Sequence, residues 1–185
     1  MSEDANSGRL RARWESAPRP IRWASVLLAL WLASILLIGI AGFATAPASD
    51  VFPEECPTDS INCTRIAENP HRGEGLTDIS FNASLEDVRA AAVAWVEGQP
   101  RTTVLLDDGG SEFHAVFRTA LVFYPDDFFL QVYCTEEGSA LRVHSESRLG
   151  VGDLGVNDER VAAFVTHMQA LEFEPVDECI PAPVV

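Results

Sequence analysis

FFLQVYCT (128–135) and ALRVHSES (140–147) are two alternating runs of apolar and polar residues, separated only by EEGS (136–139). This period of two is typical of a strand with one buried face. A short connection that contains glycine favours antiparallel pairing of the runs that it joins. The sequence therefore predicts a β-hairpin here. Its core face is expected to carry Leu130, Val132, Cys134, Leu141 and Val143.

Segments on either side extend this hairpin into an α+β domain. The runs 102–106 and 113–123 are predicted as further strands, with a short extended piece at 76–81. One helix is predicted to start at Ser84, and a second is predicted to be capped by Asn157. The expected fold is an antiparallel sheet of about four strands, covered on one side by two helices.

The segment 21–43 is uncharged apart from Arg22 and consists mostly of Leu, Ile, Val, Ala and Trp. A helix of roughly 20 apolar residues crosses a bilayer, so a single transmembrane helix is predicted, with the lipid bilayer as its partner. Basic residues precede it and acidic residues follow it. By the positive-inside rule the N-terminus is cytoplasmic and the rest extracellular, at the cell membrane. The basic residues are Arg9, Arg11, Arg13, Arg19 and Arg22.

A cleaved signal peptide is the alternative for this segment. Ala44-Thr45-Ala46 and Ala46-Pro47-Ala48 both have the small-x-small pattern of a cleavage site. The apolar run is longer than a signal peptide needs, which favours a retained signal-anchor. The expected organisation is a cytoplasmic tail (1–20), a transmembrane helix (21–43), a stalk with a Cys-pinned loop (44–75) and an exported domain (76–185).

The chain is acidic, with 28 acidic and 13 basic residues and a formal net charge of −15. Every basic residue is Arg, and none is Lys. Such a surface suits very salty water, where screening removes self-repulsion. A halophilic source is one explanation and a GC-rich genome is the other. No basic patch exists to neutralise phosphates, so nucleic acid is not expected as a partner.

Four cysteines, Cys56, Cys63, Cys134 and Cys179, all follow the apolar segment. An even number on the exported side predicts disulfides, of which three connectivities are possible. A local Cys56–Cys63 bridge is one option and would leave Cys134 with Cys179. Zinc is the competing use, but the C-x-x-C spacing is absent. No metal and no cofactor are expected.

Two glycosylation sequons lie on the same side of the apolar segment. They are Asn62-Cys63-Thr64 and Asn82-Ala83-Ser84. Both asparagines are candidate glycan acceptors, and Asn62, inside the small Cys loop, is expected to be exposed.

The stretch SESRLGVGDLGVN (145–157), closed by Arg160 and Val161, is similar to the signature of domain-of-unknown-function family 1499. FYPDDF (123–128) and the pieces Cys56-Pro57 and Asn62-Cys63 resemble two further motifs of that family. The resemblance covers roughly 54–172. His144 and Gly152 depart from the pattern, where the family usually has Arg and Ser. The resemblance implies no established activity, and its Cys pair fits an exported domain.

This loop has a structural interpretation and a functional one. In the first, Arg148 and Arg160 bridge acidic side chains in a polar network, and Asn157 caps the helix. In the second, the two arginines and the helix N-terminus form an anion or carbohydrate pocket. The acidic candidates are Asp126, Asp127 and Asp153.

Catalytic interpretations rest on few residues. His144, Ser145 and Ser147 lack a nucleophile elbow, and alternation puts His144 and Ser145 on opposite faces of the sheet. The three aspartates lack the spacing of a calcium loop. The other histidines, His71, His114 and His167, are expected at the surface.

We expect a non-enzymatic, membrane-anchored binding or envelope-associated module that uses the Arg148–Arg160 loop to bind a protein or carbohydrate. An envelope hydrolase that uses Asp126, Asp127, Asp153 and Arg148 is the alternative.

Overall fold

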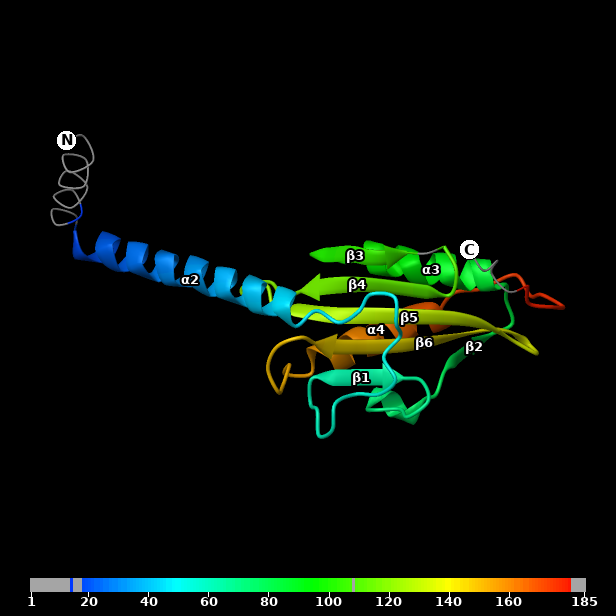
Figure 1. Cartoon of the computed structure of the whole chain (residues 1–185). Helices are drawn as coiled ribbons and strands as arrows, with labels where there is room; N and C mark the ends of the chain where they lie inside the picture. The colour runs from blue at the N-terminus through cyan, green and yellow to red at the C-terminus, as the bar shows by residue number, and fades with distance from the viewer. Residues whose placement is uncertain (1–13, 15–17, 108, 181–185) are drawn as a thin grey trace.

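The computed structural model describes residues 14, 18–107 and 109–180, and combines an apolar helix with an α+β domain (Figure 1). The predicted fold class is therefore confirmed. Most of the predicted tail, including Arg9, Arg11 and Arg13, lies outside the described residues.

Helix α2 (Arg19–Ala44) projects from one end of the domain (Figure 1). Pro18 precedes it and Pro20 occupies its first turn, where a missing N–H removes no helical hydrogen bond. At 26 residues it is long and apolar enough to cross a membrane. A signal sequence would have the same character, so the helix fits either a membrane anchor or a signal sequence.

The antiparallel sheet has the strand order β1-β6-β5-β4-β3, and β2 also pairs with β6. The predicted hairpin is confirmed, because β5 and β6 pair from Thr135 opposite Gly138 to Asp126 opposite Ser147. The strands are β1 (Cys63–Ile66), β2 (Ile79–Phe81), β3 (Thr102–Asp107), β4 (Glu112–Arg118), β5 (Pro125–Thr135) and β6 (Gly138–Ser147).

The sheet has six strands where about four were predicted. The added strands, β1 and β2, pair with successive parts of the same edge of β6. Strand β1 lies in the segment predicted to be a Cys-pinned loop. All four of its residues are buried, so the sequence does not alternate there and the strand gives no period-two signal.

Helices α3 (Leu85–Glu97) and α4 (Val156–Gln169) cover one face of the sheet (Figure 1). Ser84 caps α3 as predicted, since its Oγ accepts a hydrogen bond from the Asp87 N–H at 3.0 Å. Between these helices and the sheet lies the main core. Its largest fully buried side chains are Phe128, Phe164, Ile66, Leu130, Leu141 and Met168.

The chain between α2 and β1 crosses the opposite face of the sheet (cyan in Figure 1). Phe52, in this segment, meets the His144 ring edge-on at 6.4 Å and lies 5.0 Å from the Arg65 guanidinium. Side chains on this second face, such as His114 and Phe129, are therefore buried as well. The segment predicted as a stalk serves as cover for the sheet.

One glycine is needed for the close approach of two strands. Gly138, with φ at 134°, begins β6 beside the end of β2. A Cβ there would lie 2.3 Å from the Phe81 carbonyl oxygen. Only glycine fits this position without moving the backbone.

Candidate functional site

Asp126 and Asp127 are consecutive on β5, and so their side chains point to opposite faces of the sheet. Both are buried. Asp126 lies on the face that carries the helices, and Asp127 lies on the face covered by the chain after α2. Each aspartate organises a separate polar cluster.

The Asp126 cluster lies under the start of α4. Arg160 on α4 forms an ion pair with Asp126 at 2.7 Å. Buried Asn157 is the centre of the cluster, because its Nδ2 donates to the carbonyl of Asn62 at 2.9 Å and to Ser147 Oγ at 3.0 Å. Its Oδ1 accepts from Ser145 Oγ at 2.6 Å. The cluster thus joins β5, β6, α4 and the residue that precedes β1.

The Asp127 cluster holds a bidentate ion pair and a buried imidazole. Arg148 donates to both carboxylate oxygens of Asp127 at 2.7 Å, and His114 Nε2 lies 2.7 Å from Oδ1. Burial favours the neutral acid, but the hydrogen bonds and charges of Arg148 and His114 outweigh it and lower the pKa of Asp127 below its ordinary 3.8. The prediction of a surface His114 is wrong, because its ring is buried and stacked 3.8 Å from Phe129.

Arg148 also reaches the apolar helix. Its third contact is a hydrogen bond to the Gly42 carbonyl, in the last turn of α2, at 3.0 Å. Carbonyls at a helix C-terminus lack helical partners and favour a cation. Arg148 therefore connects the α2 terminus to the Asp127 cluster.

Gly155 is the N-cap residue of α4, so the prediction of Asn157 in that role is wrong, and the Asp153 side chain binds N–H groups at the helix start. The Asp153 carboxylate accepts from the backbone N–H of Asn157 at 2.7 Å and of Gly155 at 3.0 Å. Partial burial raises the pKa of Asp153, but these backbone hydrogen bonds lower it further, so it lies below 3.8. Asn157 is one residue inside the helix, and its side chain turns into the core instead.

The predicted residues therefore do not converge on one site. Arg148 and Arg160 pair with different aspartates on opposite faces, and Asp153 is used at the helix terminus. A single anion pocket between the two arginines does not form. A hydrolytic centre would need the three carboxylates to face one substrate. Asp126 and Asp127 point to opposite faces of β5, and Asp153 lies outside the sheet, in the connection between β6 and α4.

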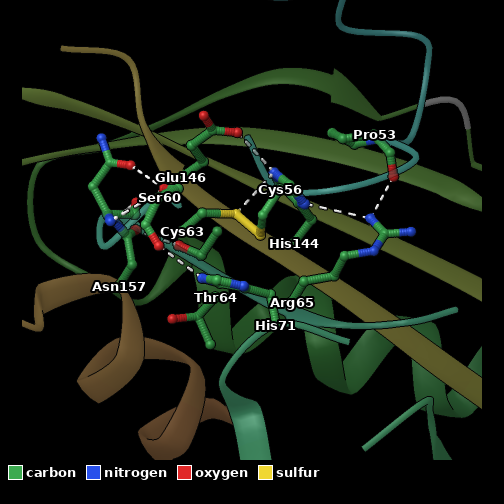
Figure 2. Close-up of a disulfide and its surroundings, with 12 residues drawn as sticks. Pro53, Cys56, Ser60, Cys63, Thr64, Arg65, His71, His144, Glu146 and Asn157 are labelled. Atoms are coloured by element: carbon green, nitrogen blue, oxygen red, sulfur yellow. Dashed lines mark hydrogen bonds and ion pairs between the residues drawn. A yellow bond between two sulfur atoms is a disulfide. The ribbon is translucent and has the colours of Figure 1, made fainter. Parts of the chain in front are cut away.

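Both pairs of cysteines form disulfides, Cys56–Cys63 and Cys134–Cys179. Figure 2 shows the first beside His144, whose Nε2 lies 3.6 Å from the Cys63 sulfur and 3.1 Å from a Glu146 carboxylate oxygen. Burial lowers the pKa of His144 below 6.5 despite Glu146. Because the bridged sulfurs are not thiolates, Cys56, Cys63 and His144 do not form a zinc ligand set while the disulfide is intact.

The two sequons differ in exposure. Asn62 is only 5 % exposed, and its Nδ2 donates to the carbonyls of Gly150 at 2.8 Å and Ser147 at 3.3 Å. The prediction of an exposed Asn62 is therefore wrong. Asn82 is exposed, and its Oδ1 accepts a hydrogen bond from the Val176 N–H.

A groove that the sequence analysis missed lies between α4 and the segment around the short 3-10 helix η1 (Gly73–Gly75). It encloses about 570 Å³. Its floor is apolar, and charged side chains of Arg72, Glu74 and Asp158 stand among its lining. The only sequence signal was the spacing of Asp158, Val161, Ala162, Val165, Thr166 and Gln169, which form one face of a helix.

The protein therefore belongs to the class that combines one apolar helix with a disulfide-bonded α+β domain. Two internal ion-pair clusters stabilise this domain. The chain belongs to the family described as protein of unknown function DUF1499, whose model matches residues 54–168. The matched range includes both clusters and the 145–157 loop. No curated protein matches the chain.

Proposed function

We propose that this protein is a non-enzymatic binding module of the cell envelope, held by α2 in the membrane with its domain on the outer side. The groove along α4 is the observation that carries the binding role. Within the described residues, it combines an apolar floor with charged groups at a volume typical of ligand sites. The two ion-pair clusters then serve as the frame of the domain.

Retention of α2 is supported by its contacts with the domain. Trp31 Nε1 donates to the Leu121 carbonyl at 3.0 Å, and Arg148 donates to Gly42. A Cβ on Gly42 would lie 2.5 Å from Pro125 Cγ, so the helix approaches the start of β5 closely. Cleavage after Ala46 would remove all three contacts, whereas a membrane anchor keeps them.

Export is supported by the charges and the disulfides. Arg19 and Arg22 precede the apolar stretch, and Asp50, Glu54 and Glu55 follow it. Disulfides persist in oxidising compartments. On the outer side, exposed Asn82 is the proposed glycan acceptor.

The shape of the groove favours an extended peptide of a partner protein. One wall is the α4 face from Asp158 to Gln169, which is about 16 Å long at 1.5 Å per residue and matches about five extended residues. Ile66, Leu76 and Val165 offer contacts to apolar side chains. The net charge of −15, and the excess of Glu74 and Asp158 over Arg72 at the groove, favour basic residues between them.

The test uses the full chain in phosphatidylcholine nanodiscs and two labelled five-residue peptides, one alternating Val with Arg and one alternating Val with Glu. We expect the Arg peptide to bind at least about tenfold more tightly, as measured by fluorescence anisotropy. Ala162→Gln, which fills the groove, should weaken binding about tenfold. Ala163→Gln is the matched control, since this neighbouring exposed alanine does not line the groove.

Equal affinities for the two peptides would contradict the charge argument. Binding that is unaffected by Ala162→Gln, or no binding by either peptide, would overturn the assignment of the groove.

A further inference from the structure

Two loops at the α2 end of the domain expose large apolar side chains. The β4–β5 connection reads TALVFY (119–124) and has no charged residue. Leu121 in it is 75 % exposed. The β6–α4 connection carries Val151, which is 86 % exposed, and Leu154, which is fully exposed. Both connections leave the sheet at the end from which α2 projects (Figure 1).

Two exposed apolar residues of these loops have an unfavourable backbone conformation. Phe123 and Leu154 have φ values of 58° and 57°. This left-handed region favours Gly or Asn and is uncommon for bulky residues. A turn alone would be better made by glycine, so the presence of large apolar residues at both positions indicates a contact for their side chains.

The β4–β5 loop lies alongside the apolar helix. Trp31 Nε1 donates to the Leu121 carbonyl at 3.0 Å. Phe43 is the last residue of the predicted transmembrane segment. Trp31 lies about 18 Å before it along the helix axis, at 1.5 Å per residue. A hydrocarbon core is about 30 Å thick. Leu121 therefore lies beside a part of α2 that is deep enough to be within the bilayer.

One face of α2 is adapted to this contact. Most of the helix is exposed, but the residues that are partly or fully covered recur at helical spacing in its second half. They are Ser34, Ile35, Ile38, Ala41 and Gly42. The covered residues lie on one face of α2, and the other apolar side chains of the helix are exposed.

Basic groups border the same loop. Arg118 immediately precedes it, and Arg101 Nε donates to the Arg118 carbonyl at 3.0 Å. Thr103 Oγ1 accepts from Arg118 at 2.9 Å. Apolar and aromatic side chains next to arginines match a membrane interface, where the former enter the acyl region and the latter meet phosphates. Two arginines at this end are notable in a domain with few basic residues.

We propose that residues 119–124 and 149–154 form a lipid-binding surface that inserts into the bilayer from the domain's side of the membrane. This surface, together with α2, fixes the orientation of the domain against the bilayer. The proposal rests on the membrane anchoring proposed above. Its occupant is phospholipid, because the surface is continuous with the apolar helix and has the composition of an interface.

The test places a photoreactive benzophenone amino acid at single positions of the full chain in phosphatidylcholine liposomes. Leu121 and Leu154 are the test positions. Leu36, on the exposed side of α2, reports on anchoring, and Ile180, 80 % exposed but outside both loops, is the matched control. After irradiation, lipid adducts are measured by intact-protein mass spectrometry.

We expect adducts at Leu36, Leu121 and Leu154, each at least tenfold more abundant than at Ile180. Adducts at Leu36 alone would overturn the lipid-binding surface and leave the anchor in place. Protein–protein crosslinks at Leu121 and Leu154 instead of lipid adducts would assign this surface to a second copy and overturn the proposal. The absence of adducts at all four positions would overturn the anchoring as well.

Discussion

The guanidinium of Arg148 is held by Asp127 in a bidentate ion pair, with both N–O distances at 2.7 Å. Both side chains are almost fully buried, and Arg148 also donates to the last turn of α2. The same pair thus stabilises the second face of the sheet and fixes the domain to the apolar helix. We therefore expect the pair to act in stabilising the domain and in attaching it to α2.

Replacing Arg148 by Met should lower the free energy of unfolding by about 3 kcal/mol, because it leaves the Asp127 carboxylate buried without its main partner. Arg142→Met is the matched control. The ion-pair partner of Arg142, Glu68, is 79 % exposed, and the other contacts of Arg142, Gln131 and the Tyr133 ring, are neutral. Since no charge is left buried, the loss should be only about 1 kcal/mol. Denaturant unfolding of the full chain in detergent micelles measures both. Equal losses in the two variants would contradict a structural role for the Arg148 pair.

Stability should depend on pH in two windows. Asp127 has a lowered pKa, so its contribution is complete above about 3.8 and is lost as the pH falls through the folded-state value. His144 also has a lowered pKa, and its contribution declines as the pH falls below 6.5, where the unfolded chain takes up the proton first. Unfolding measured from pH 8 to pH 2 should show that His144→Gln flattens the upper window and Asp127→Asn the lower one. Unchanged slopes would contradict these assignments.

The two disulfides should differ in their effect on stability. Cys134–Cys179 spans 45 residues and Cys56–Cys63 spans 7. Chain entropy then predicts losses of about 4 and about 2.4 kcal/mol when each pair is replaced by alanines. Thermal unfolding of the two paired variants gives the order. A larger loss for the short loop would show that the local packing of His144 and Phe52 dominates over chain entropy.

Asp153→Ala should cost about 1 kcal/mol, the usual effect of losing a helix cap. Asn157→Ala should cost more, about 3 kcal/mol, because the Asn62 carbonyl, buried hydroxyls on β6 and Arg160 on α4 lose their hydrogen-bond partner together. Denaturant unfolding distinguishes the two variants. The reverse order would contradict the central role of Asn157 in the buried cluster.

The strands and helices with regular periodicity were predictable from the sequence. The β5–β6 hairpin and the Ser84 cap were correct because alternation and capping are local signals. Strand β1 was missed because it is buried on both faces and carries no alternation. Its pairing with β6 depends on residues about 80 positions away, which no local pattern reveals.

The candidate site was predicted in composition but not in arrangement. Arg148 in the 145–157 loop and Arg160 on α4 form ion pairs with Asp127 and Asp126, which is the kind of contact that the structural interpretation predicted. That the two pairs occupy opposite faces follows from alternation on β5, which was available in the sequence. The burial of His114 was not predictable from the sequence, because it depends on how the segment after α2 covers the sheet face opposite the helices. The groove along α4 likewise depends on a distant segment, 72–76.

The most direct test of the proposed topology is labelling of intact cells with a membrane-impermeant maleimide after mild reduction by an impermeant reductant. All four cysteines follow α2 in the chain and are bridged in pairs. The account predicts that the reduced protein is labelled on intact cells and remains in the membrane fraction. Labelling only after the cells are broken open would contradict it.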